Sequence, residues 1–116
     1  MLVVDDDVRL RAMLTEYLTR NGFEVTAAGT CSAAQAKLAR DAFEVIVLDV
    51  ALPDGSGLEV LETLRARGRA PRATLAMTGH DDSKTRRACL DAGCTDVLVK
   101  PLPIAELLRQ IERHLA

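Results

Sequence analysis

Short runs of apolar, β-branched residues alternate along this chain with segments whose apolar residues recur at helical spacing. Residues 45–48 are continuously apolar, as in a strand buried on both faces of a sheet. Residues 10–18 instead follow the i, i+3, i+4, i+7, i+8 pattern of an amphipathic helix. This alternation runs through the whole chain and predicts an α/β fold. We expect a doubly wound (βα)5 three-layer sandwich with a five-stranded parallel sheet.

The same periodicities place the individual elements. Strands are expected at residues 2–4, 23–27, 45–48, 73–77 and 97–99. Each is followed by an expected helix, with apolar faces at 10–18, 32–42, 58–64, 85–92 and 104–115. The first face consists of Leu10, Met13, Leu14, Tyr17 and Leu18, and the fourth is a stripe of small residues, Thr85, Ala88, Cys89 and Ala92. Since aromatic residues make up only 3% of the chain, the core is expected to be aliphatic.

Polar residues and glycines indicate where the helices begin and end. Asp7 is expected to cap the first helix, which Asn21 and Gly22 end. Ser32 and Gln35 fit a capping box that opens the second helix. The later signals are Ser56 with Glu59, Gly68, Gly93 and Pro103.

The bulk composition excludes several classes of protein. With 116 residues the chain is too short for two cores, so residues 1–116 are expected to form a single domain. The net charge of −2 gives no electrostatic reason to expect binding to DNA, RNA or an anionic membrane. No apolar run approaches the roughly 20 residues of a membrane span, and the first residues do not form a signal peptide. A cytoplasmic location is expected, with Cys31, Cys89 and Cys94 as free thiols because their spacing fits no zinc site.

Polar residues follow four of the expected strands at their carboxyl ends. Asp5 and Asp6 follow the first strand, Asp49 the third, Thr78 the fourth and Lys100 the fifth. In an open parallel sheet, ligands bind in the crevice outside the carboxyl ends of the strands. We therefore expect these five side chains to share one pocket.

The expected pocket combines three carboxylates, an ammonium group and a hydroxyl. Three carboxylates repel one another unless a cation is supplied or their pKa values rise. Lys100 offsets part of this charge, and a divalent metal would offset more. Oxygen ligands favour Mg²⁺, with Mn²⁺ as a substitute, and Mg²⁺ commonly binds phosphate oxygens as well. The pattern therefore indicates phosphoryl chemistry with an aspartate as the nucleophile.

Four segments, in this order, resemble the receiver domains of response regulators, a family with a flavodoxin-like fold. They are residues 3–6, residues 48–53 followed by Gly57, residues 77–79 and residues 99–101. An Asp–Asp pair alone is common, whereas the four segments together, each at a strand end, are specific. The resemblance covers essentially the whole chain. It implies a phosphoryl-accepting module of two-component signalling that catalyses only its own phosphorylation and dephosphorylation.

The resemblance also implies a role for each matching acid. Asp49 would take the phosphoryl group from a phosphohistidine donor. Asp6 and Asp49 would bind Mg²⁺ directly, Asp5 mainly through water, and Ala51 through its backbone carbonyl oxygen. Such a site would neutralise charge on the transferring group.

The remaining matched residues would bind the phosphoryl group. Lys100 would pair with Asp49 at rest and with the phosphoryl group afterwards, and the Thr78 hydroxyl would bond a phosphoryl oxygen. Backbone N–H groups near Val50 and Gly79 would add to this stabilisation. The Lys100–Pro101 bond is expected to be cis, as is usual in the family.

Some positions depart from the family's pattern. Val97 stands where receivers often carry an aromatic residue that reports phosphorylation, so the output switch is expected to be muted or to use another element. Leu102 stands where phenylalanine is frequent, and Ser56 where an acidic residue is frequent. Ala51 and His80 occupy positions that tune the phosphoryl lifetime in the family, without predicting a rate here.

The implied partners are a sensor histidine kinase or a histidine phosphotransfer protein. An output or kinase domain joined to the receiver in a longer protein is also compatible with the resemblance. The expected partner surface is the fourth helix, fifth strand and fifth helix, through which a homodimer could form.

Several residues are interpreted without a catalytic role. His80 is expected to be a solvated loop residue and His114 a helix-end residue that complements the helix dipole. A basic stretch is expected to form a solvated face, and it consists of Arg65, Arg67, Arg69 and Arg72.

Three other functions fit the sequence less well. An aspartate-nucleophile phosphatase generally carries a second aspartate where this chain has Ala51. A cofactor-binding flavodoxin-like domain would need an anion-binding loop, whereas Asp5, Asp6 and Asp7 would repel a phosphate. A pseudo-receiver that serves only as an interaction scaffold stays an alternative because of Val97.

Overall fold

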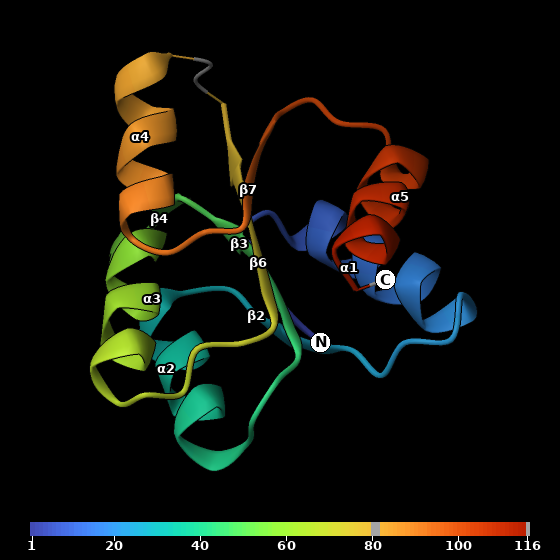
Figure 1. The fold of residues 1–116 in the computed structure, drawn as a ribbon. Helices are drawn as coiled ribbons and strands as arrows, with labels where there is room; N and C mark the ends of the chain where they lie inside the picture. Colours follow the sequence, from blue (N-terminus) through green and yellow to red (C-terminus); the bar gives the residue numbers. More distant parts are fainter. Residues whose placement is uncertain (80–81, 116) are drawn as a thin grey trace.

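A five-stranded parallel sheet forms the middle layer of the computed structural model, which describes residues 1–79 and 82–115 (Figure 1). Its order is β2-β1-β3-β6-β7, and each neighbouring pair runs parallel. The strands are β1 (Leu2–Val4), β2 (Thr26–Ala28), β3 (Val45–Asp49), β6 (Ala73–Thr78) and β7 (Asp96–Val99). From β1 the chain moves to one side for β2 and then to the other for β3. This reversal opens a crevice at the carboxyl ends of β1 and β3.

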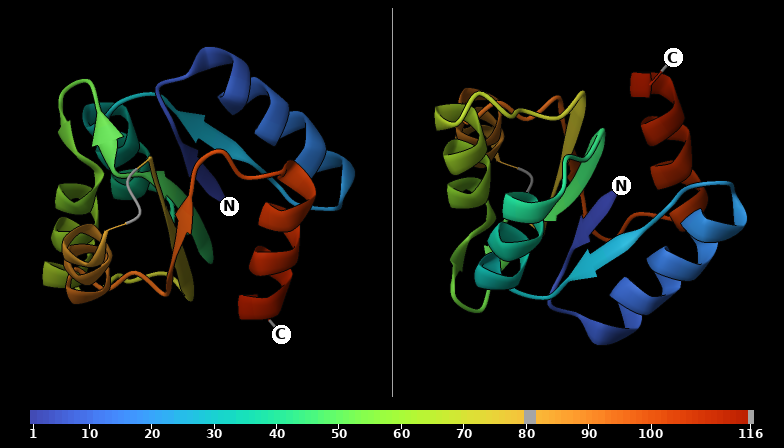
Figure 2. Two further views of the ribbon diagram at one scale, coloured as in Figure 1. Left: turned by 90° about the horizontal axis from the view of Figure 1, so that it is seen from above. Right: turned by 90° about the horizontal axis from the view of Figure 1, so that it is seen from below.

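Helices cover both faces of the sheet, as the sequence predicts. On one face lie α1 (Val8–Arg20) and α5 (Ile104–Leu115), and on the other lie α2 (Cys31–Arg40), α3 (Gly57–Ala66) and α4 (Ser83–Asp91) (Figures 1 and 2). Among the described residues, no helix combines the length and apolar character needed to cross a bilayer. The predicted doubly wound α/β architecture is therefore confirmed.

The sheet separates the core into aliphatic clusters. Beneath α1 and α5, side chains from both helices pack on alternate residues of the central strands, and the largest are Leu14, Leu18, Leu75, Leu107 and Ile111. The opposite face packs Ile46 and Leu48 against α2 and α3. A smaller cluster lies between α4 and β7 and contains Cys89, Ala92, Cys94 and Val97.

Most helix ends are formed by the residues that the sequence indicates. Asp7 Oδ1 accepts hydrogen bonds from the Arg9 and Leu10 amides and so caps α1. Ser56 caps α3 through the Leu58 amide. The α2 prediction was wrong, because Thr30 rather than Ser32 is the N-cap. The helix begins at Cys31 and ends at Arg40, since the Thr30 hydroxyl accepts the Ala33 N–H at 3.0 Å.

Three other expectations of detail were wrong. Met13 is 53% exposed, and Ala88 also lies on the surface, because no neighbouring element covers those positions of α1 and α4. The second strand begins at Thr26 rather than residue 23, since pairing with β1 starts there.

A two-stranded antiparallel hairpin, which the sequence did not predict, follows β3. It consists of β4 (Ala51–Leu52) and β5 (Gly55–Ser56). The chain then passes so close to β3 that a Cβ atom on Gly57 would lie 2.2 Å from the Asp49 carbonyl oxygen. Only glycine fits there, which explains Gly57 at the end of the hairpin.

Candidate functional site

The carboxyl ends of four strands bring the predicted polar residues together. Asp5 follows β1, Asp49 ends β3, Thr78 ends β6 and Lys100 follows β7. Beside them is an open cavity of about 460 Å³, which we call the acidic pocket. It is lined by Asp6, Asp49, Val50, Ala51, Thr78, Gly79, Thr85 and Lys100.

Three acids of this region are close enough to share a cation. Asp5, Asp6 and Asp49 each offer a carboxylate oxygen, and these oxygens lie within 4.8 Å of one another. Asp5 is fully buried and Asp49 is 6% exposed, whereas Asp6 faces solvent. Oxygen donors at this spacing fit a hard divalent metal better than a soft one. The predicted acidic cluster is therefore present and has the donor set of a divalent-metal site.

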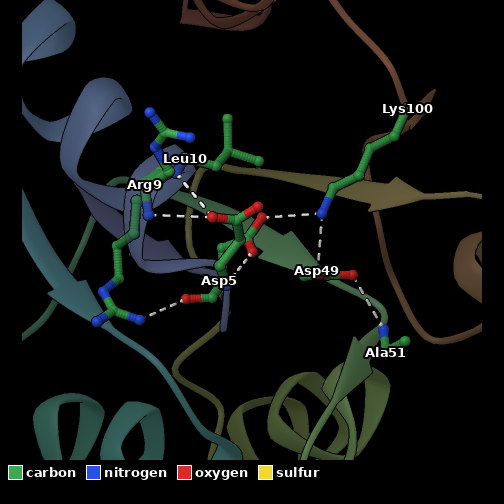
Figure 3. Close-up of polar contacts among 8 residues, drawn as sticks. Asp5, Arg9, Leu10, Asp49, Ala51 and Lys100 are labelled. Atoms are coloured by element: carbon green, nitrogen blue, oxygen red, sulfur yellow. Dashed lines mark hydrogen bonds and ion pairs between the residues drawn. The ribbon is translucent and has the colours of Figure 1, made fainter.

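The Lys100 ammonium group lies between two of the acids. Its Nζ is 2.9 Å from Asp5 Oδ2 and 2.9 Å from Asp49 Oδ2 (Figure 3). The predicted pair with Asp49 is thus present, and the pair with Asp5 is additional. Lys100 reaches these acids from the edge strand β7, which is separated from β1 by two strands.

Burial and charge act against each other in this cluster. Burial raises the pKa of Asp49, and the Lys100 ammonium and the Ala51 amide only partly oppose that rise. Burial by itself would lower the pKa of Lys100, but the hydrogen bonds and charges of Asp49 and Asp5 outweigh it and raise this pKa. The surroundings therefore favour the charged form of Lys100 and disfavour the charged form of Asp49.

Backbone groups complete the surroundings of Asp49. Its Oδ1 accepts a hydrogen bond from the Ala51 amide at 3.1 Å (Figure 3). The Val50 N–H itself donates to the Met77 carbonyl at 3.0 Å, so the neighbouring Ala51 amide is the group in this stretch that bonds Asp49. The available amide near Asp49 is consequently one residue further along the chain. The Val50 N–H is used in this way because β6 lies beside β3 and continues the hydrogen bonding of the sheet.

The β1–α1 connection holds Asp5 in place. Asp5 Oδ1 accepts the Asp7 amide at 2.9 Å, and the Asp5 carbonyl accepts a hydrogen bond from Arg11 Nη1 at 2.8 Å. Arg11 lies over Gly29, where a Cβ atom would meet its guanidinium at 2.6 Å. The sequence analysis missed Arg11, and only its position one turn into the helix after Asp5 could have indicated it.

Thr85 is a second residue that the sequence analysis missed. It was interpreted as part of a packing stripe, but it also lines the acidic pocket from the first turn of α4. A helix that follows a parallel strand begins at the carboxyl end of the sheet, which is the signal that could have placed Thr85 there.

The other predicted features have mixed outcomes. The Lys100–Pro101 bond is cis, as expected. Val97 is buried against α4. All three cysteines are free thiols, also as expected. His80 lies outside the described residues.

Two surface residues make contacts that the sequence did not indicate. His114 Nε2 lies 3.2 Å from Asp96 Oδ2, so it links the end of α5 to the start of β7. Arg65, which was expected to be solvated, donates from Nη1 to the Asp91 carbonyl at 2.8 Å. Both contacts lie away from the acidic pocket.

Comparison with known proteins matches residues 1–112 to the response regulator receiver domain. Protein PetR of Rhodobacter capsulatus is 40% identical over 111 residues, which are 96% of this chain and 46% of PetR. Response regulator MprA of Mycobacterium leprae shows the same identity over 96% of this chain and 48% of its own. The chain thus spans about half the length of the curated relatives it matches.

Solved structures agree in fold. A CheY-like response regulator receiver domain protein from Methanospirillum hungatei superimposes with a TM-score of 0.89 at 30% identity, covering 98% of this chain and 90% of that one. The beryllofluoride-activated N-terminal receiver domain of RstA from Klebsiella pneumoniae has a TM-score of 0.86 at 25% identity, covering 98% and 96%.

Proposed function

Because the chain belongs to the response regulator receiver family, the phosphoacceptor modules of two-component systems, we propose that Asp49 accepts the phosphoryl group in a Mg²⁺-dependent reaction. The observation that carries this assignment is the position of Asp49. It ends β3, lines the open cavity, and has one oxygen on Lys100 and the other on the Ala51 amide. Asp5 is fully buried, which makes it a poorer nucleophile for a bulky donor.

In this proposal the three acids and one carbonyl bind the metal. Asp6 and Asp49 would bind Mg²⁺ directly, Asp5 through water and Ala51 through its carbonyl oxygen. When bound, Mg²⁺ supplies positive charge to the transferring group and to the acids around it. Mn²⁺ would serve as a substitute because it accepts the same oxygen donors.

The chain's own groups then act in a defined order. A carboxylate oxygen of Asp49 attacks phosphorus, an O–P bond forms, and the P–N bond to the donor imidazole breaks. Lys100 exchanges its hydrogen bond with Asp49 for one with a phosphoryl oxygen. The Thr78 hydroxyl and the Ala51 amide line the same cavity and would donate to the remaining oxygens.

The donor and the cellular context belong to the same proposal. A receiver takes its phosphoryl group from a cognate histidine kinase or a histidine phosphotransfer protein in the cytoplasm. The curated relatives are about twice as long as this chain, which supports a receiver joined to an output domain. The face formed by α4, β7 and α5 would then serve as the surface for a partner or a second copy.

Beryllofluoride binding and covalent labelling test the assignment together. With Mg²⁺ present, beryllofluoride is expected to shift the amide resonances of Ala51 and Gly79, and acetyl phosphate is expected to label the protein in intact mass spectra. Asp49→Asn should abolish both results while its circular dichroism spectrum stays unchanged. Undiminished labelling of the variant would refute Asp49 as acceptor. Absence of both responses in the unmodified chain would favour the pseudo-receiver scaffold, which the buried Val97 keeps as the second candidate.

A further inference from the structure

The turn of the β4–β5 hairpin is hydrogen-bonded to the start of a helix through Asp54. Its Oδ1 accepts the Cys31 amide at 2.8 Å, and its Oδ2 accepts the Ser32 amide at 3.0 Å. These amides belong to the first turn of α2, where backbone N–H groups have no partner within the helix. The Asp54 carboxylate, from a different part of the chain, therefore helps to cap the N-terminus of α2.

Two residues share the capping of α2, and they do so differently. Thr30 caps the helix locally, with its hydroxyl accepting the Ala33 amide at 3.0 Å. Asp54 reaches the helix from more than twenty residues away. Hydrogen bonds from the Ser32 and Cys31 amides hold the pKa of Asp54 below its ordinary value. The carboxylate is thus held in its charged form by α2.

The hairpin that contains Asp54 also provides the backbone groups next to Asp49. At its first strand, the Ala51 amide donates to Asp49 Oδ1 at 3.1 Å. At its end, the Gly57 amide donates to the Val50 carbonyl at 2.8 Å. Between them, the Cys31 thiol donates to the Ser56 carbonyl at 3.5 Å, so the hairpin also contacts the start of α2.

We propose that Asp54 is a positioning residue for the acceptor site: its two hydrogen bonds to α2 fix the hairpin and thereby hold Ala51 in place beside Asp49. This inference rests on the proposed function, in which the Ala51 carbonyl binds Mg²⁺. Asp54 does not line the acidic pocket and touches neither the metal nor the phosphoryl group. It acts only through the backbone between residues 51 and 54.

The alternative is that Asp54 merely stabilises α2, and Thr30 provides the matched control. Both residues cap the same helix, but only Asp54 belongs to the hairpin. Asp54→Ala and Thr30→Ala should both lower the melting temperature because each removes a cap. Only Asp54→Ala should change the acceptor site.

Mg²⁺ titration by calorimetry and amide hydrogen exchange, both on the unphosphorylated chain, provide the test. We expect Asp54→Ala to raise the Kd for Mg²⁺ about threefold to tenfold, because groups that orient a metal ligand commonly affect affinity on this scale or above. Exchange of the Ala51 amide should accelerate in the same variant. Asp54→Asn keeps one acceptor oxygen, so its Kd and its Ala51 exchange rate should lie between those of Asp54→Ala and the unmodified chain. This variant replaces Asp54→Ala in the test if Asp54→Ala does not fold.

Equal Mg²⁺ affinity and Ala51 exchange in the unmodified chain and the Asp54 variants would overturn the inference. So would a Thr30→Ala variant that weakens Mg²⁺ binding as much as Asp54→Ala does. If the unmodified chain binds no Mg²⁺, the proposed function fails instead. Ala51 exchange then still decides whether Asp54 holds the hairpin.

Discussion

Burial has opposite effects on the free energy of folding in two regions of this molecule. One is the aliphatic core beneath α1 and α5, and the other is the acidic pocket at the carboxyl ends of the strands. Along β3, Val45 and Val47 alternate into the aliphatic core, and Asp49 continues the same alternation at the end of the strand. Val47 is fully buried and Asp49 is 6% exposed, so the two differ little in burial. They differ in chemistry: burial of valine stabilises the fold, whereas burial of a carboxylate costs free energy unless a cation is close.

The two regions of the sheet therefore contribute differently to the stability of the chain and to its polar site. The aliphatic region determines whether the chain folds. The acidic pocket keeps the Asp49 carboxylate poorly solvated at the wall of an open cavity. Substitutions in the aliphatic core should therefore change stability alone, whereas substitutions in the acidic pocket should also change the response to Mg²⁺ or pH.

The largest effect on stability is expected in the aliphatic core. Leu107 on α5 is 1% exposed, and Leu107→Ala should lower the free energy of unfolding by about 2–5 kcal/mol in urea titrations. The Kd for Mg²⁺ should stay unchanged because the pocket is left intact. Leu90→Ala on α4 is the matched control: Leu90 is 50% exposed, and its loss should be within about 0.5 kcal/mol. Equal losses in the two variants would contradict the comparison.

A smaller effect is expected when the cation of the pocket is removed. Lys100→Met should destabilise the chain by about 1–3 kcal/mol without metal, since Asp5 and Asp49 are left buried without a counter-charge. Saturating Mg²⁺ should restore part of this loss because it supplies the missing charge. Urea titrations with and without Mg²⁺ measure both quantities. Lys84→Met at an exposed position should show neither response, and a Lys100 variant insensitive to Mg²⁺ would argue against a shared metal site.

The pH dependence of unfolding tests directly whether burial of Asp49 costs free energy. The raised pKa of Asp49 means that the folded chain binds this proton more tightly than the unfolded chain does. Stability of the unmodified chain should therefore fall as pH rises from the ordinary value of 3.8 through the folded pKa, relative to Asp49→Asn. Unfolding of both proteins across acid and neutral pH gives the difference, in which groups that do not contact Asp49 cancel. A gain in stability of the unmodified chain relative to Asp49→Asn as pH rises would contradict the raised pKa.

The smallest effect is expected for a histidine–aspartate contact far from the pocket. His114 and Asp96 are 3.2 Å apart at the opposite end of β7, and their side chains are 20% and 32% exposed. His114→Gln should change the free energy of unfolding by about 0.2–1 kcal/mol and leave the Mg²⁺ affinity unchanged. Calorimetry and urea titration check the two expectations. A change in Mg²⁺ affinity here would show that the pocket responds to charge generally rather than to its own residues.

Local signals predicted the elements well where neighbours in sequence make the contacts. Asp7 caps α1 with the amides two and three residues ahead, and Gly22 follows the helix with a positive φ of 93°. The start of α2 was misplaced because its amides are shared between Thr30 and Asp54. No local pattern reveals a cap that comes from a separate hairpin.

The predicted helix faces were too broad for a similar reason. Met13 and Ala88 satisfy the helical spacing, yet both are exposed, because spacing describes one helix and burial needs a neighbour. Packing also decides which N–H group near Val50 reaches Asp49: the Val50 N–H donates to Met77 on β6, and the Ala51 N–H donates to Asp49. These errors concern contacts between elements and leave the order of the elements correct.

Local patterns were enough to predict the alternating elements, the aliphatic core and the identities of the acids, the hydroxyl and the lysine at the strand ends. Periodicity and residue chemistry are properties of short stretches, so they can be read without coordinates. Three contacts could not be predicted in this way: Lys100 contacts Asp5 as well as Asp49, Ala51 supplies the amide, and Asp54 joins the hairpin to α2. Each of these depends on distances between elements, and those distances are set by how the strands pair and the helices pack.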